Sequence, residues 1–148
     1  MAGKSEEELR RLSVEIRFLE QTVEAIHSRI NTVNAIITDL TYASMTLEGL
    51  EKENENAELL IPIGGNSYIK AKLESSDKII VGMGAGISVE KTLQEAKEIV
   101  KNRLESFEKT RASLQQQLAQ VAEKIGEDRE KFESLMAEAR ERKTVKDV

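Results

Sequence analysis

Aliphatic residues recur at alternating steps of three and four along the first third of the chain. Ten of them follow in unbroken order: Leu9, Leu12, Ile16, Leu19, Val23, Ile26, Ile30, Val33, Ile37 and Leu40. A period of 3.5 residues places them in one narrow seam of an α-helix, which is typical of a coiled coil. The pattern weakens at Ser44, returns at Leu47 and ends in the polar run 51–56. It predicts a helix over about 6–50.

The last third of the chain repeats this pattern. Polar residues interrupt it at Lys97, Arg111 and Asp128, and polar seam residues commonly fix the register between paired helices. The pattern predicts a second helix over about 89–142, with Ser88 or Thr92 as its N-cap. Because neither seam is stable when exposed to water, we expect the two helices to pair antiparallel within one chain. The second seam consists of Leu93, Val100, Leu104, Phe107, Leu114, Leu118, Val121, Ile125, Phe132 and Leu135.

Between the helices the apolar period changes from 3.5 to 2. In 67–74, apolar side chains alternate with charged ones, as in a half-buried β-strand. The turn-forming runs 64–66, 74–77 and 84–86 divide the segment into four short strands, which we expect to form two hairpins. Pro62 cannot donate to a strand ladder and belongs at an edge or a strand start. The predicted fold is α+β, with a first coiled-coil helix in 1–56, two hairpins in 57–88 and a second helix with its tail in 89–148.

Two isolated hairpins are weak structures with open edges. We therefore expect hairpins of several subunits to complete a larger sheet or barrel. The predicted assembly residues are the apolar members of the strands: Leu59, Ile61, Ile63, Ile69, Ala71, Leu73, Ile79, Val81, Met83, Ile87 and Val89.

Composition supports long helices with solvated faces rather than an ordinary globular core. Aromatic residues make up only 3% of the 148 residues, whereas charged residues reach 33%. The absence of cysteine excludes disulfides and thiolate metal sites. A formal net charge of −5 argues against a nucleic-acid partner. Nothing resembles a signal peptide or an apolar run long enough to span a membrane, so we expect a soluble, cytoplasmic protein.

The glycine-rich stretch 79–88 is the one segment that resembles a phosphate-binding loop. A Walker loop would need glycine where Glu90 stands, and a dinucleotide fingerprint would need glycine where Ile87 stands. Glycines in a strand pattern more often permit bulges and sharp bends. The lone His27 follows seam residue Ile26 and has no cysteine to complete a metal site. We therefore expect no catalytic residue, no cofactor and no metal.

The central segment 59–96, "LLIPIGGNSYIKAKLESSDKIIVGMGAGISVEKTLQEA", resembles the prefoldin family, and specifically its archaeal α-type subunits. The matching motifs are Ile61-Pro62-Ile63-Gly64, Val81-Gly82-Met83-Gly84, Glu90-Lys91 and Glu95-Ala96, while Gly65-Asn66 departs from the usual turn. Two hairpins rather than one distinguish α-type from β-type subunits, and the organisation matches over nearly the whole chain.

The resemblance implies a molecular chaperone without ATPase activity. Two α-type and four β-type subunits would join through their hairpins into a double β-barrel. The free coiled-coil tips would hold unfolded client proteins and deliver them to a group II chaperonin. The apolar residues expected at this chain's tip lie both on and off the seam: Leu9, Leu12, Val14, Ile16, Phe18, Phe132, Leu135 and Met136.

Long heptads and open strand edges also fit a second function. The chain could be a structural coiled-coil tether, or a filament subunit that polymerises through its hairpins. Solution mass and suppression of client aggregation separate the two functions.

Overall fold

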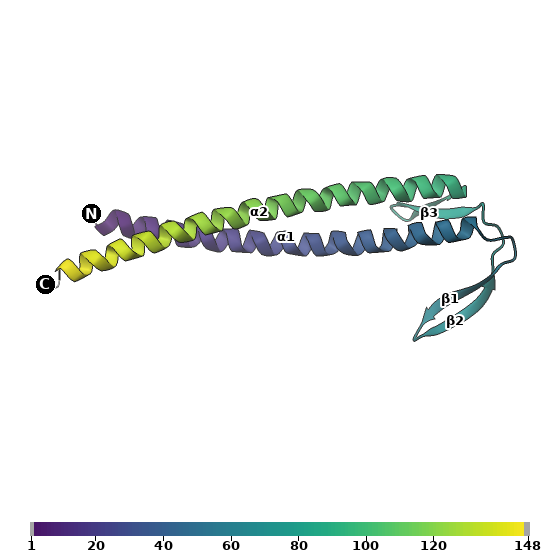
Figure 1. Cartoon of the computed structure of the whole chain (residues 1–148), viewed down its shortest axis with the longest axis horizontal. Coiled ribbons are helices and arrows are strands. Elements are labelled where there is room, and N and C mark those ends of the chain that lie inside the picture. Colours follow the sequence, from purple (N-terminus) through teal and green to yellow (C-terminus); the bar gives the residue numbers. More distant parts are fainter. Residues whose placement is uncertain (1, 147–148) are drawn as a thin grey trace. The chain divides into compact units, whose positions relative to one another are not determined.

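The computed structural model describes residues 2–146, which form two long helices and four strands (Figure 1). The order is α1 (Ala2–Glu51), β1 (Glu58–Gly64), β2 (Ser67–Lys72), β3 (Ile79–Gly84), β4 (Ile87–Lys91) and α2 (Leu93–Lys146). The predicted α+β arrangement of a coiled coil with two central hairpins is confirmed. The chain divides into a terminal unit, Met1–Asn34 with Lys109–Val148, and a central unit, Ala35–Glu108.

In the terminal unit, segments of α1 and α2 pack antiparallel along the predicted seam. Two polar contacts join the paired helices: Arg129 donates to Glu20 at 2.7 Å, and Arg111 donates to the Asn34 side chain at 3.1 Å. The buried apolar residues of this unit are all seam residues, namely Leu12, Ile26, Ile30, Val33, Leu114 and Ile125.

In the central unit, the ends of the two helices enclose one apolar cluster together with β3. Val81 of β3 packs with Leu47, Leu93, Ala96 and Val100, and Ile79 lies against them. At the same end of the helices, Glu51 accepts hydrogen bonds of 2.7 Å from Lys97 Nζ and from Gln94 Nε2. The hydrogen bond from Lys97, then that from Gln94, lowers the pKa of the Glu51 carboxyl.

The second helix begins later than the predicted residue 89. The fourth strand continues to Lys91, because Glu90 and Lys91 still pair with Ile80 and Ile79 of β3. The N-cap is Thr92, whose hydroxyl accepts a hydrogen bond of 3.2 Å from the Glu95 N–H. Ser88, the other candidate, pairs with Gly82 inside the sheet.

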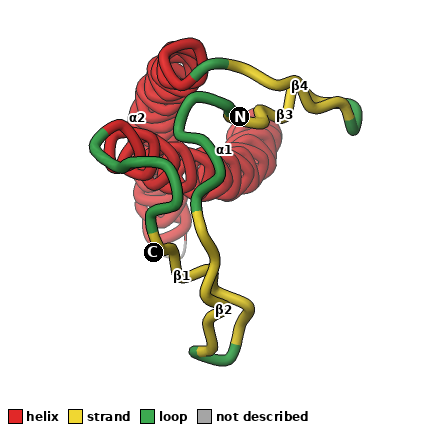
Figure 2. Tube along the Cα trace, turned by 90° about the vertical axis from the view of Figure 1, so that its right-hand side faces the viewer, coloured by secondary structure: helices red, strands yellow, loops and turns green. Residues whose placement is uncertain are grey.

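The strands form two separate two-stranded antiparallel sheets, β1–β2 and β3–β4 (Figure 2). Both hairpins turn in the same way. A glycine with φ near +95°, Gly64 at 99° or Gly84 at 95°, stands at a register shift before the turn. The two turn residues then have positive φ, as a type I′ turn requires: Gly65 and Asn66 in one hairpin, Ala85 and Gly86 in the other.

Candidate functional site

The β1–β2 hairpin has exposed apolar side chains on both faces. Ile61 pairs with Ile69 on one face, and Pro62 pairs with Tyr68 on the other. The exposed residues of this hairpin include Leu60, Ile61, Ile63, Tyr68 and Ile69. Their exposure shows that no helix of the central unit covers either face. Leu59, Ala71 and Leu73 are half-buried.

The β3–β4 hairpin is instead docked on the helices of its own chain. Arg103 of α2 donates a 2.7 Å hydrogen bond to the Gly82 carbonyl, and its guanidinium lies 3.7 Å from the Met83 sulfur. Val81 is only 7% exposed. The side chain of Val81 is therefore already covered within the chain. This differs from the expectation that Val81 contacts another subunit. The remaining apolar surface of this hairpin consists of Ile80, Met83, Ile87 and Val89, all exposed, while Ile79 is half-buried.

Three of these exposed residues, Leu60, Tyr68 and Ile80, were missed by the sequence analysis. An alternating pattern assigns one face of each strand to the interior and treats the other as solvated. The consecutive apolar residues in 59–63 were the available signal, because such a run fills both faces of a strand.

The glycines of 79–88 lie in a strand and a hairpin turn. A phosphate-binding loop presents its backbone N–H groups at the start of a helix, whereas here the turn at Ala85 and Gly86 leads into β4. A β-carbon added at Gly84 would meet nothing within 4 Å. Conformation therefore explains the glycine, since φ of +95° is strained for any other residue.

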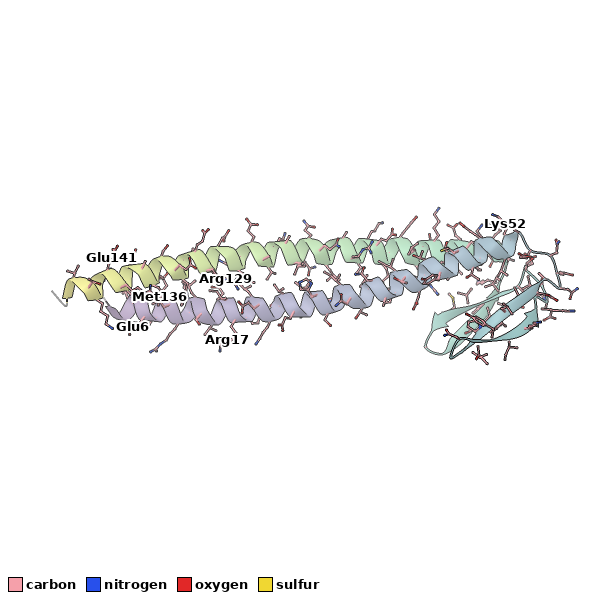
Figure 3. All side chains as sticks on the ribbon, turned by 60° about the horizontal axis from the view of Figure 1, so that its bottom comes forward. Glu6, Arg17, Lys52, Arg129, Met136 and Glu141 are labelled. Carbon is pink, nitrogen blue, oxygen red and sulfur yellow. The ribbon has the colours of Figure 1, made fainter. Side chains whose placement is uncertain are left out.

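In the terminal unit, three apolar residues outside the seam are exposed to solvent. Val14 is 69% exposed and Phe18 66%, and both follow one face of α1 at a spacing of four residues. Met136 on α2 is 36% exposed (Figure 3). Leu9, Ile16, Phe132 and Leu135 are half-buried, as expected of seam residues near a helix end. Leu12 is only 2% exposed, so in this conformation it offers no surface to a ligand.

Asp128 is the one polar side chain that the described part of the chain buries, at 1% exposure. Lys124, one turn earlier on α2, places its Nζ 3.2 Å from Oδ1. This close donor contact with Asp128 raises the pKa of Lys124. The contact with Lys124 is an ion pair, and no other described residue gives either carboxylate oxygen of Asp128 a hydrogen bond.

The terminal unit also has a shallow depression of about 450 Å³, lined by Glu8, Glu127, Glu130, Lys131, Ser134 and Leu135. Among residues 2–146, no group of three His, Asp or Glu side chains is placed to hold a metal ion. Neither described helix contains a stretch apolar enough to cross a bilayer.

The profile of the family described as "Prefoldin subunit" matches residues 6–138. The chain belongs to the prefoldin family. It is similar to the prefoldin subunit alpha of Methanococcoides burtonii, with 36% identity over 84% of this chain and 91% of that protein. The prefoldin subunit alpha of Methanopyrus kandleri is 35% identical over 76% of this chain and 72% of its own length.

A solved structure, a filamentous prefoldin from Methanocaldococcus jannaschii studied by cryo-electron microscopy, is also similar. Its TM-score is 0.66 at 26% identity, over 76% of this chain and 93% of that one. Prefoldin is a family of non-enzymatic chaperone subunits, and its alpha subunits assemble into oligomers with other prefoldin subunits.

Proposed function

We propose that this chain is a subunit of an ATP-independent holding chaperone, assembled through its hairpins and binding unfolded proteins with its terminal unit. Two subunits of this kind would combine with four β-type subunits in the cytoplasm. The complex would pass its clients to a group II chaperonin.

Assembly through the hairpins is supported by their uncovered apolar surface. Ile61 and Ile69 face each other on β1–β2 with about half of each side chain exposed, and Ile80 is 76% exposed. Contiguous apolar surface of this kind marks a protein–protein contact. The strand edges are also open, so a neighbouring hairpin can extend each sheet through its backbone.

Client binding is supported by Val14, Phe18 and Met136, which lie outside the buried seam and contribute little to holding the two helices together. Several such subunits in one complex would bind a client at several points, which raises the overall affinity of weak single contacts. Methionine adapts to differently shaped partners, which suits a surface that binds many sequences.

The test changes these three residues to serine in the full chain assembled with a β-type subunit. We expect unchanged mass and helicity, and weaker suppression of aggregation of a denatured client. The matched control changes Tyr42 and Met45 of the central unit to serine, because they are 65% and 61% exposed on the same helix. Equal loss in both variants, or no loss in the first, would contradict a client site in the terminal unit.

A filament-forming subunit is the second candidate, favoured by the open strand edges and by the likeness to the filamentous prefoldin. The native mass of the isolated chain separates the two. A series of masses without an upper limit indicates polymerisation, whereas a closed complex formed only with β-type subunits indicates the chaperone.

A further inference from the structure

The methionines are the side chains of this protein that peroxides oxidise most readily. The sequence has no cysteine, so its four methionines are the first targets of two-electron oxidants. Three of them lie in the described part of the chain: Met45 is 61% exposed, Met83 50% and Met136 36%. Exposure alone would make Met45 the most reactive of the three.

Met83 has a cationic hydrogen-bond donor beside its sulfur. The Nη2 atom of Arg103 lies 3.7 Å from the sulfur, and the same atom donates a 2.7 Å hydrogen bond to the Gly82 carbonyl, which holds the guanidinium in place. Within the described residues, no such donor contacts the sulfur of Met45 or Met136. A fixed cationic donor at this position can stabilise the negative charge that develops when a peroxide reacts with the sulfur.

The backbone also places Met83 at an irregular point of its hairpin. The strands β3 and β4 shift register between Gly82 and Gly84, so Met83 has no paired residue in β4. Ile63 has the equivalent position in β1–β2, where it also lacks a paired residue. Both side chains are exposed, Met83 at 50% and Ile63 at 59%. The two hairpins therefore differ at this position by one oxidisable side chain.

We propose that Met83 is an oxidation site for hydroperoxides and that its sulfoxide weakens assembly through the β3–β4 hairpin. The sulfur attacks one peroxide oxygen, so that an S–O bond forms and the O–O bond breaks. The sulfur loses two electrons and the peroxide accepts them. The proton of the transferred oxygen passes to the leaving oxygen, which departs as water or an alcohol. Arg103 donates to the leaving oxygen as it gains negative charge.

The effect on assembly rests on the proposed function, in which a neighbouring subunit covers the exposed apolar surface of this hairpin. Met83 belongs to that surface together with Ile87 and Val89. A sulfoxide is polar and hydrated, and a partner that covers it must remove its water. Oxidation therefore acts on the free subunit. Two thiols can reduce the sulfoxide, with a disulfide and water as products, and this restores the apolar side chain.

The first experiment treats the full chain with hydrogen peroxide and measures the oxidation rate of each methionine by mass spectrometry of peptides. We expect Met83 to react faster than the more exposed Met45. Arg103→Gln should slow the oxidation of Met83 about fivefold, whereas Arg103→Lys, which keeps a cationic donor, should retain most of the rate. If Arg103 only held the hairpin in place, Arg103→Gln would expose Met83 and speed its oxidation. That result, or faster oxidation of Met45 than of Met83 in the wild type, would overturn the proposal.

The second experiment compares the affinity of the reduced and the oxidised full chain for a β-type subunit. The wild type should bind about tenfold more weakly after peroxide treatment, because one polar group must be desolvated. Methionine sulfoxide reductases should restore its affinity. Met83→Ile, which reproduces the residue of the other hairpin, should have the same affinity before and after treatment. Met45→Leu should respond to peroxide as the wild type does.

Two results of the second experiment have different meanings. Equal affinity of the reduced and the oxidised wild type would overturn the effect of Met83 oxidation on assembly. An untreated wild-type chain that binds no β-type subunit would instead refute the proposed function, and the effect on assembly with it. Preferential oxidation of Met83 in the isolated chain does not depend on assembly and is decided by the first experiment.

Discussion

An Ile69→Asp and Val81→Asp pair tests whether the two hairpins have different roles. Ile69 is 55% exposed in the single chain, so a carboxylate there stays hydrated and should change chain stability by no more than about 0.5 kcal/mol. Val81 is 7% exposed within the helix-packed cluster. A carboxylate at that site loses about 1.5–3 kcal/mol of apolar burial, and its desolvation adds several kcal/mol more.

The two variants should fail at different levels. Ile69→Asp should affect formation of the complex, whereas Val81→Asp should affect the stability of the single chain. If a neighbouring subunit covers the exposed half of Ile69, the substitution forfeits about 1 kcal/mol of apolar burial per copy. The buried charge adds several kcal/mol. We therefore expect Ile69→Asp to retain its helicity by circular dichroism but to lose the large complex in native mass measurements. Val81→Asp should lose thermal stability even as a single chain.

Ile69→Leu is the control for Ile69→Asp, because it keeps an apolar side chain of the same volume at the same position and adds no charge. It should assemble normally. An Ile69→Asp complex of full mass would refute the placement of this face in an intersubunit contact. A Val81→Asp chain as stable as the wild type would refute its role in the central cluster.

Two further predictions concern the turn and an ion pair of the central unit. Gly84→Val should destabilise the β3–β4 hairpin by about 1–3 kcal/mol in urea unfolding, because φ at Gly84 is positive. Gly82→Val is the control, at a glycine without positive φ or close neighbours, and should cost far less stability. Equal losses would contradict the conformational explanation. The pKa of Glu51 is lowered from 4.5 by Lys97 and Gln94, so its stabilising contribution is present above that pH and is lost as pH falls through the lowered value. The stability advantage of the wild type over Glu51→Gln in thermal unfolding should therefore shrink as the pH falls below 4.5 and through the lowered pKa of Glu51. An advantage that stays constant would show that the pair does not couple to folding.

The seams, the two hairpins and the turns were predictable because each depends on local periodicity or on glycine. Other features depend on contacts between residues that are distant in the sequence. The choice between Ser88 and Thr92 as the helix cap was decided by strand pairing with Gly82, and the burial of Val81 by α1 and α2. Asp128 was recognised as an interruption of the seam. Its burial beside Lys124 depends on how the paired helices pack, which no sequence pattern specifies.

The two hairpins should lose different amounts of conformational entropy when they bind a partner. The difference comes from Arg103 and from the apolar cluster around Val81, which hold only the β3–β4 hairpin. The β3–β4 hairpin is held against the helices by the hydrogen bond from Arg103 and by the packing of Val81, so a partner strand would order it little further. The β1–β2 hairpin has no such support on either face, and a partner must supply the ordering that the helices do not. In the proposed assembly, a contact through β3–β4 would therefore cost less conformational entropy than a contact through β1–β2.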